Sequence, residues 1–347
     1  MKTGLPITIG LDLFGYGNIG DDIMISGFAR GLKELGLDRR CVYGPRTSDP
    51  ASQRLRCPEI LWDTICPTPR SSCIWAAVGD TPFQATWGDQ VLRVLVARKD
   101  EIGAHARKIM VCAGAESEML PWAGAHKPVA ALFDRISTRD DHSYGIITGA
   151  VGVPKERVLP AADLANISLA YLFKDRKPER RYPLGTVLMA DTLSREDVRV
   201  FASFVDGEGA PTSFIAGDVR SIPLHEVYVY RELRQEGYLP NAELSVPPYR
   251  TGSVEDLVRP ISECETLVSS RYHCLLAAAW AGCRVAIVGR SSKLTALARV
   301  LSVPCATLPL TLERLNEIRR DACVVPRETL SDLRERALEG IRFCLTD

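Results

Sequence analysis

The sequence lacks several features that would assign it to a specialised class. It has no excess charge of either sign, with 43 Lys and Arg residues against 43 Asp and Glu residues. Such a chain creates no strong field for a polyanion, so nucleic-acid binding would need a local basic patch. No uninterrupted apolar run approaches the roughly 20 residues of a membrane-spanning helix. The start, MKTGLPITIG, lacks a signal-peptide pattern. We therefore expect a cytoplasmic protein without a transmembrane segment that binds no nucleic acid.

The 11 cysteines form no C-x-x-C pair. Zinc and iron–sulfur sites usually take their ligands from such closely spaced pairs. Most of the thiols stand in apolar contexts, for example SSCIWAAV and IMVCAGA. We therefore expect most cysteines to be small buried hydrophobic side chains, and we expect no metal site.

A chain of 347 residues is long enough for two domains. Its first half alternates apolar strand patterns with helical apolar spacing. Buried apolar strands separated by helices are typical of a parallel sheet covered on both faces. In this half we expect strands at 5–14, 41–45, 71–80, 108–115, 135–141 and 157–163, and helices at 20–37, 87–106, 126–136 and 141–152.

The charged stretch FKDRKPERRYP (173–183) has almost no apolar residue, and we interpret it as a linker rather than as a basic surface for an anionic acceptor. After it the alternation restarts. Strands are expected at 185–191, 212–218, 242–247, 265–270 and 284–289, helices at 194–205, 224–236, 253–263, 273–282 and 292–301, and a closing helix at 325–345.

The pattern predicts an α/β fold of two doubly wound, Rossmann-like domains facing a cleft, similar to the glycosyltransferase B architecture. Such folds bind ligands beyond the carboxyl ends of their strands. The expected bounds are 1–172 for an acceptor-side domain, 173–183 for the linker, 184–324 for a donor-side domain and 325–347 for the closing helix.

The stretch GYGNIGDD (15–22) follows a predicted strand and opens a predicted helix. Its glycines permit positive φ and close approach of another group, and the helix start offers free N–H groups. The glycine spacing is that of a dinucleotide site, but two adjacent carboxylates would repel a pyrophosphate. One carboxylate suits a helix cap. The other suits a sugar hydroxyl, so we expect acceptor contacts at Gly15, Gly17, Asn18, Gly20 and Asp21, with Asp21 or Asp22 as a base.

A second polar cluster follows the strand predicted at 265–270, where Arg271 and His273 open a helix of small residues. Arginine offers a planar donor fork for phosphate or carboxylate, and histidine can donate to an anion or exchange a proton near neutral pH. The next strand-to-helix junction carries GRSSK (289–293). A buried, satisfied Arg–His pair is the structural alternative. Two neighbouring loops at one sheet edge nevertheless predict an anion site.

Three motifs, in this order, resemble the polysaccharide pyruvyltransferase family. They are GYGNIGDDIMISGFARGL (15–32), ISTRDDHSYGIITGAVGVPKERVLPAADLA (136–165) and SSRYHCLLAAAWAGCRVAIVG (269–289). The resemblance implies transfer of a pyruvyl group from phosphoenolpyruvate to a sugar as a ketal. It also implies a donor site built from Arg271, Tyr272, His273 and Lys293. Among the residues themselves, the hydroxyls of Ser270 and Ser292 are further candidates for the donor's negative charges, and Arg139 is a candidate that could reach the cleft.

Arg139 has a structural alternative, which is pairing with Asp140. The sequence departs from the family pattern at AVGDTPF (77–83), at Arg284 and at GRSSK (289–293).

The residues are compatible with a reaction that needs no cofactor and no metal, because positive side chains can neutralise the leaving phosphate. His273 serves either as the acid that protonates the enol carbon or as a phosphate ligand. The acceptor is a sugar, an oligosaccharide or a lipid-linked glycan, and the last would bring the protein to the inner face of the membrane. Two alternatives stay open. One is a sugar-nucleotide glycosyltransferase, with Glu313 or Glu317 on a ribose, and the other is a non-catalytic sugar- or anion-binding relative.

Overall fold

The computed structural model describes residues 4–11, 14–37, 41–47, 50–84, 90–176 and 178–346. The chain divides into two compact units. Unit 1 comprises 1–16, 21–168 and 331–347, and unit 2 comprises 17–20 and 169–330. The predicted bounds differ, since 17–20, 169–172 and the predicted linker at 173–183 group with unit 2, whereas the end of the closing helix groups with unit 1.

Unit 1 is built on a seven-stranded sheet of order β3-β2-β1-β4-β5-β6-β7 within the described residues. Each neighbouring pair of strands is parallel. The strands are β1 (Ile7–Ile9), β2 (Val42–Tyr43), β3 (Ile60–Leu61), β4 (Ile74–Val78), β5 (Arg107–Ala113), β6 (Arg135–Thr138) and β7 (Val158–Pro160). The central strand β4 is buried along its whole length, and this explains its continuous apolar sequence.

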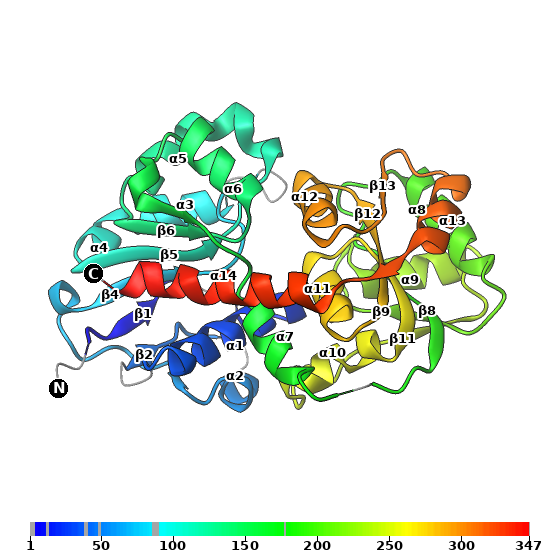
Figure 1. Ribbon diagram of the computed structural model, residues 1–347, viewed down its shortest axis with the longest axis horizontal. Coiled ribbons are helices and arrows are strands. Elements are labelled where there is room, and N and C mark those ends of the chain that lie inside the picture. Colours follow the sequence, from blue (N-terminus) through cyan, green and yellow to red (C-terminus); the bar gives the residue numbers. More distant parts are fainter. Residues whose placement is uncertain are drawn as a thin grey trace. The chain divides into compact units, whose positions relative to one another are not determined.

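Helices cover both faces of this sheet (Figure 1). Side chains of one group of helices form a core with Trp75, Met110 and Ile136 of the strands. This group consists of α3 (Gln90–Ala97), α4 (Lys99–Gly103), α5 (Ala123–Ala130) and the π-helical turn η3 (Ile146–Ala150). The remaining short elements of the unit are α2 (Pro50–Arg56), α6 (Asp141–Gly145) and the 3₁₀ turns η1 (Arg70–Ser72), η2 (Ser117–Trp122) and η4 (Lys155–Arg157).

Glycines allow three helices to pack closely on the other face of unit 1. These helices are α1 (Ile19–Glu34), α7 (Ala165–Leu172) and α14 (Arg327–Leu345). A Cβ at Gly27 of α1 would lie 1.9 Å from the backbone oxygen of Leu164, and a Cβ at Gly340 of α14 would lie 3.0 Å from Sγ of Cys112 in β5. The end of the chain therefore completes the core of unit 1.

Unit 2 repeats the architecture with the strand order β10-β9-β8-β11-β12-β13, in which each neighbouring pair is parallel. A short antiparallel strand, β14 (Cys323–Val324), also pairs with β12. The others are β8 (Tyr182–Val187), β9 (Thr212–Ile215), β10 (Ala242–Ser245), β11 (Cys264–Ser269), β12 (Arg284–Gly289) and β13 (Cys305–Thr307). Unit 2 therefore has the Rossmann strand order, in which the carboxyl ends of the central strands form the ligand edge.

The helices of unit 2 also form two layers (Figure 1). One layer packs on the core of Leu184, Phe214 and Val268, and consists of α8 (Arg195–Asp206), α9 (Glu226–Gln235) and α13 (Leu312–Asp321). The other consists of α10 (Val254–Ser262), α11 (Tyr272–Trp280) and α12 (Ser292–Leu301), which contact β11 and β12. Capping boxes start α8 at Ser194 and α10 at Ser253, so each first turn is satisfied locally.

The predicted α/β fold class is confirmed, and most predicted elements lie within a few residues of their expected positions. Three differences stand out. The helix predicted at 87–106 is two helices, α3 and α4, and its first residues (87–89) lie outside the described part of the chain. The strand β13 and the helix α13 were not predicted. The stretch predicted as a linker at 173–183 already contains the start of β8.

The described residues show how the linker charges and the thiols are used. In the linker, Arg176 forms an ion pair with Glu255, and Arg180 donates to the backbone oxygen of Cys264 over 3.0 Å. Most cysteines are buried, as expected, and burial raises the pKa of Cys344 to about 11. No three or more His, Cys, Asp or Glu side chains within the described ranges could hold a metal ion. No helix in those ranges has both the length and the apolarity to span a bilayer.

Replacing Gly27 by Ala tests the close packing of α1. The new methyl group would meet a backbone oxygen, which cannot rotate away, so we expect a loss of about 2 kcal/mol of unfolding free energy. Urea denaturation of the whole chain measures it. Gly103→Ala is the matched control, because a Cβ there meets nothing within 4 Å. An equal loss in both variants would contradict the packing argument.

Candidate functional site

The glycine-rich segment 17–20 is bonded to the end of β9 inside unit 2. Asn18 pairs with Asp218 in an antiparallel bridge. The Ile19 N–H donates to the Gly217 oxygen over 3.1 Å, and the Val219 N–H donates to the Gly17 oxygen over 3.0 Å. The motif is therefore held by backbone hydrogen bonds at the carboxyl end of a strand of unit 2.

Gly20 packs directly against His273. A Cβ at Gly20 would lie 2.1 Å from Nδ1 and 3.0 Å from the Cβ of His273. Because the contact reaches the base of the histidine side chain, a larger residue at position 20 could not be accommodated by a small rotation of the ring. Two of the predicted site residues are thus in contact, and the glycine is required by this contact.

His273 belongs to the first turn of α11, which begins after β11. Arg271 is the N-cap residue of this helix, and its N–H donates to Oγ of Ser269 over 2.9 Å. The ring of Tyr272 is buried and lies edge-on to the imidazole of His273, with a centroid distance of 5.4 Å. The first N–H groups of a helix carry a partial positive charge, so this turn is suited to an anion.

Arg271 is held by a buried carboxylate. Its Nε donates to Oε1 of Glu226 over 2.6 Å, and its Nη2 donates to Oε2 over 3.0 Å. Glu226 begins α9, and its side chain has no exposed surface, whereas 12% of the Arg271 side chain is exposed. Burial alone would lower the pKa of Arg271, but the carboxylate of Glu226 raises it above its ordinary value, so the guanidinium stays charged.

A second buried carboxylate, Asp218, lies beside this pair. It accepts hydrogen bonds from the N–H and Nε of Arg220 over 3.0 and 2.9 Å, and Nδ1 of His225 lies 3.2 Å from its Oδ2. Burial would raise the pKa of Asp218, but the hydrogen bonds from Arg220 and His225 and the charge of Arg271 lower it. Asp218 therefore stays ionised and links the glycine segment to the arginine.

The side chain of Ser270, which follows β11, is buried and bonded to the segment that follows β8. It is completely buried, and its Oγ accepts a hydrogen bond from the N–H of Met189 over 2.8 Å. Its backbone oxygen accepts from Nε of Arg290 over 3.1 Å, and Arg290 also forms an ion pair with Asp191. The loops after β11 and β12 are thus bonded to each other at one sheet edge.

The second helix start at this edge is that of α12. Ser291 is its N-cap residue, yet its Oγ is buried and has no hydrogen-bond partner among the residues that the structure describes. Ser292 and Lys293 are half-buried in the first turn. Two helix N-termini and the side chains of Arg271, His273 and Lys293 therefore belong to neighbouring loops of unit 2.

The remaining candidates belong to unit 1. Asp22 is fully buried and ion-paired with Arg56, with 2.6 Å between Oδ2 and Nη1. Its Oδ1 accepts from Nε2 of Gln53 over 2.9 Å and from the N–H of Gly15 over 3.2 Å. These bonds give Asp22 a structural role and hold Gly15 at a φ of 84°. Of the two predicted bases, Asp21 in the first turn of α1 is only half-buried and is the better candidate.

Arg139 is also buried in unit 1. Its Nη1 donates to Oγ1 of Thr81 over 2.9 Å, and its Nε lies 3.4 Å from Oδ2 of Asp140. Asp140 in turn caps α6, because its Oδ1 accepts from the N–H of Ser143 over 2.6 Å. These contacts match the structural alternative of an Arg139–Asp140 pair, and a role of Arg139 in donor binding stays a prediction.

Four side chains of unit 2 that support the edge were not predicted as site residues. They are Asp191, Asp218, His225 and Glu226. Asp191 and Asp218 end two strands that the sequence predicts, at 185–191 and 212–218. A carboxylate at the end of a parallel strand was therefore a usable signal. Nothing local in the sequence marks Glu226 as the partner of Arg271.

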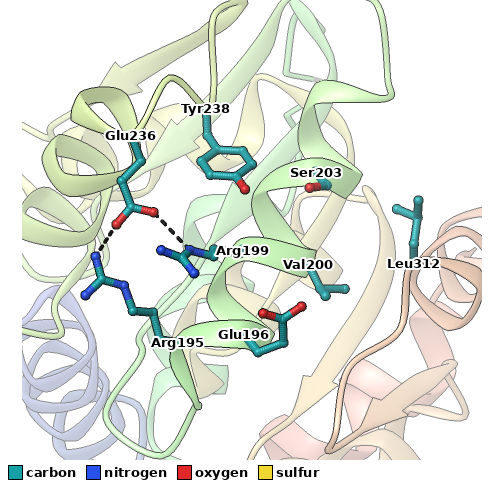
Figure 2. A pocket seen from close by; sticks show the side chains of 8 residues that line it. All are labelled: Arg195, Glu196, Arg199, Val200, Ser203, Glu236, Tyr238 and Leu312. Carbon is teal, nitrogen blue, oxygen red and sulfur yellow. Dashed lines mark hydrogen bonds and ion pairs between the residues drawn. The ribbon is translucent and has the colours of Figure 1, made fainter.

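A separate surface pocket of about 800 Å³ lies on unit 2 and is lined by residues of α8 with Glu236, Tyr238 and Leu312. Figure 2 shows Glu236 bridging Arg195 and Arg199 in this pocket. Hydrogen bonds that the two arginines donate to its carboxylate lower the pKa of Glu236. None of the predicted site residues lines the pocket.

Two Rossmann-like units with polar loops at the carboxyl ends of the strands define a fold of the glycosyltransferase B type. Solved structures agree. The UDP-GlcNAc 2-epimerase from Neisseria meningitidis is 11% identical with a TM-score of 0.62, and the match covers 98% of this chain and 99% of that chain. S. aureus MnaA with UDP is 11% identical with a TM-score of 0.60, covering 96% and 93%. A glycosyltransferase from Rickettsia africae is 8% identical with a TM-score of 0.54, covering 99% and 94%.

At these identities the structural matches show the fold alone. In sequence, residues 124–292 match the model of the polysaccharide pyruvyl transferase family. This confirms the resemblance predicted above. The matched range contains the motifs at 136–165 and 269–289, whereas the glycine segment and Lys293 lie outside it. No curated protein matches the chain.

The departure from the family pattern at Arg284 lies away from these loops. Arg284 begins β12, at the opposite end of the strand from Ser292 and Lys293. Its Nε donates to the backbone oxygen of Ala322 over 2.8 Å, and its Nη2 donates to that of Arg320 over the same distance. This departure therefore lies outside the candidate site.

Gly20→Ala tests the contact between the glycine segment and His273. Since the added methyl group must displace the imidazole, we expect the binding of phosphoenolpyruvate, the donor proposed below, to weaken at least about tenfold. Isothermal titration calorimetry measures the affinity. Gly124→Ala is the control, because a Cβ there meets nothing within 4 Å. Unchanged affinity in the Gly20 variant would show that the contact has no part in binding.

Arg56→Gln tests the structural role of Asp22. The substitution leaves a buried carboxylate without its cation, so we expect a loss of about 3 kcal/mol of unfolding free energy. Lys108→Gln removes the partner of the half-exposed Asp134 and should cost less than about 1 kcal/mol. Similar urea denaturation curves for Arg56→Gln and the unaltered chain would refute the assignment.

Proposed function

We propose that the protein transfers a pyruvyl group from phosphoenolpyruvate to a sugar or glycan acceptor, forming a ketal and releasing phosphate. The observation that carries the proposal is the arrangement at one sheet edge of Arg271, His273 and Lys293 at two helix N-termini, within or next to the range that matches the family. The family match indicates a transferase that acts on polysaccharides, and the donor is our proposal.

The charge of the donor matches this edge. Phosphoenolpyruvate carries about three negative charges on its phosphate and carboxylate at neutral pH. The N–H groups of Tyr272 and His273, the ammonium of Lys293 and the start of α12 can oppose these charges. Part of the charge of Arg271 is already balanced by Glu226, so Lys293 and the two helix starts supply much of the attraction.

The proposed chemistry begins at the methylene carbon of the donor. Protonation turns it into a methyl group and makes the central carbon electrophilic, and His273 is the candidate acid or phosphate ligand. An acceptor hydroxyl forms a C–O bond and loses its proton to a base, for which Asp21, the residue after Gly20, is the candidate. The bond to phosphate breaks, a second hydroxyl attacks, and its proton leaves with the phosphate.

The residues in these steps are side chains and backbone groups of the chain, and the proposal includes no cofactor and no metal. The donor-side contacts would come from Arg271, Tyr272, His273, Ser292 and Lys293. Gly17, Asn18 and Gly20 would serve the acceptor side. A cytoplasmic enzyme follows from the proposed donor, a product of central metabolism. A lipid-linked acceptor would add contact with the inner face of the membrane.

The sugar-nucleotide alternative has weaker support. Glu317 is part of an exposed ion pair with Arg314 in α13, with 2.5 Å between Oε2 and Nη1. Glu313 is exposed in the first turn of the same helix. Neither contact suggests a ribose ligand. The UDP in the S. aureus MnaA structure belongs to that protein, and the likeness of this chain to it is one of fold.

Phosphate release from phosphoenolpyruvate in the presence of candidate glycans tests the proposal. We expect release that depends on the acceptor and falls at least about 100-fold in His273→Ala. His142→Ala is the control, because this histidine lies in α6 and contacts Ser117. Stabilisation by a nucleotide sugar without phosphoenolpyruvate turnover would favour a glycosyltransferase. Binding of a sugar or anion without any turnover would favour a non-catalytic protein.

A further inference from the structure

The guanidinium of Arg271 is oriented by a single partner. Both of its hydrogen bonds to Glu226 are short and run side by side, in the fork geometry that arginine forms with a carboxylate. The bonds use Nε and Nη2. Nη1 donates no hydrogen bond among the parts of the chain that the structure describes, and this nitrogen belongs to a side chain that is 12% exposed.

The ion pair with Glu226 fixes the orientation of the Arg271 guanidinium and adds no net charge to the site. Glu226 has no exposed surface, and a buried ion pair seldom adds to stability beyond what apolar residues of the same size would provide. Ser269 and Asp218 hold the arginine from other sides, through its backbone N–H and through charge, respectively. The guanidinium is therefore a planar donor group. Glu226 binds its Nε and Nη2, and Nη1 lies on the edge that Glu226 does not occupy.

We propose that Glu226 is a positioning residue of the donor site, which orients Arg271 so that the Nη1 edge of its guanidinium receives an anionic group of the donor. The inference rests on the proposed function, since it assigns a role within the same site. Glu226 acts through Arg271 and does not itself touch the donor.

Removing the carboxylate has two physical effects that oppose each other. Whether the affinity for phosphoenolpyruvate rises or falls therefore shows which effect is larger. Loss of a negative charge beside the site would strengthen the binding of any anion. In Glu226→Gln, however, an amide N–H₂ can face the Nη2 donor. The guanidinium would then rotate away from the orientation that it has beside the Glu226 carboxylate. If orientation matters more than charge, phosphoenolpyruvate binds more weakly although the site has become more positive.

The test is a double-mutant cycle of phosphoenolpyruvate binding, measured by calorimetry on the full chain. We expect Glu226→Gln to weaken binding at least about tenfold and Arg271→Gln to weaken it further. The double variant should bind like Arg271→Gln to within about twofold, because Glu226 acts only through the arginine. Unchanged or tighter binding by Glu226→Gln, or the same loss in both backgrounds, would overturn the inference.

Two controls separate this role from a general effect on folding. Glu236→Gln removes another carboxylate of unit 2 that pairs with arginine, in this case with Arg195 and Arg199 at the surface pocket of Figure 2, and it should leave the affinity unchanged. Glu226→Asp keeps the charge and shortens the side chain, so it should weaken binding without loss of charge even if Glu226→Gln does not fold. Unchanged affinity in this variant would also count against the role.

The same titration separates the inference from the function on which it rests. If the unaltered chain binds phosphoenolpyruvate but the Glu226 variants bind it equally well, the positioning role fails and the proposed function stands. If the unaltered chain does not bind phosphoenolpyruvate, the proposed function fails, and the inference fails with it.

Discussion

The ion pair of Glu226 and Arg271 is the interaction on which the candidate site depends. It joins the start of α9 to the start of α11, so two helices that follow different strands meet at one edge of the second sheet. Asp218 lies beside it and binds Arg220, His225 and the glycine segment. The two buried carboxylates hold the arginine in place and keep the net charge of this cluster low. An anion that binds there must therefore gain much of its attraction from helix N-termini and Lys293.

The glycine segment and the histidine form the second constraint. Gly20 lacks a side chain because His273 occupies that space, and Gly17 has a φ of 111°, which favours glycine. The three glycines and the adjacent aspartates of this motif thus have separate causes. Gly15 and Asp22 belong to a buried network with Arg56, whereas Gly17 and Gly20 adapt the chain to β9 and α11. A motif that looks like one ligand-binding loop combines two structural tasks.

The fold could be predicted from the sequence because its signals are local. Apolar runs such as IWAAV and RVAIVG form buried strands of parallel sheets, and glycines or capping boxes mark where helices begin and end. The position of Arg271 and His273 at a helix start followed from the same reasoning. The partners of these residues did not, since Glu226 is 45 positions away from Arg271 and its neighbours in the sequence resemble those of any amphipathic helix. Asp22 and Arg139 show the converse, because charge in a motif suggested ligand binding where the structure has buried pairs.

The return of the chain to unit 1 has a consequence for its biogenesis. Residues 331–347 belong to a unit that otherwise ends at residue 168, and they cover Cys112 and Ser137 of the first sheet. During synthesis on a ribosome, the end of α14 cannot cover its face of that sheet until 169–330 has been synthesised. Unit 2 has nearly all of its residues in one continuous stretch and can form its core earlier. The core of unit 2 can therefore be complete before that of unit 1, although most of unit 1 is synthesised first.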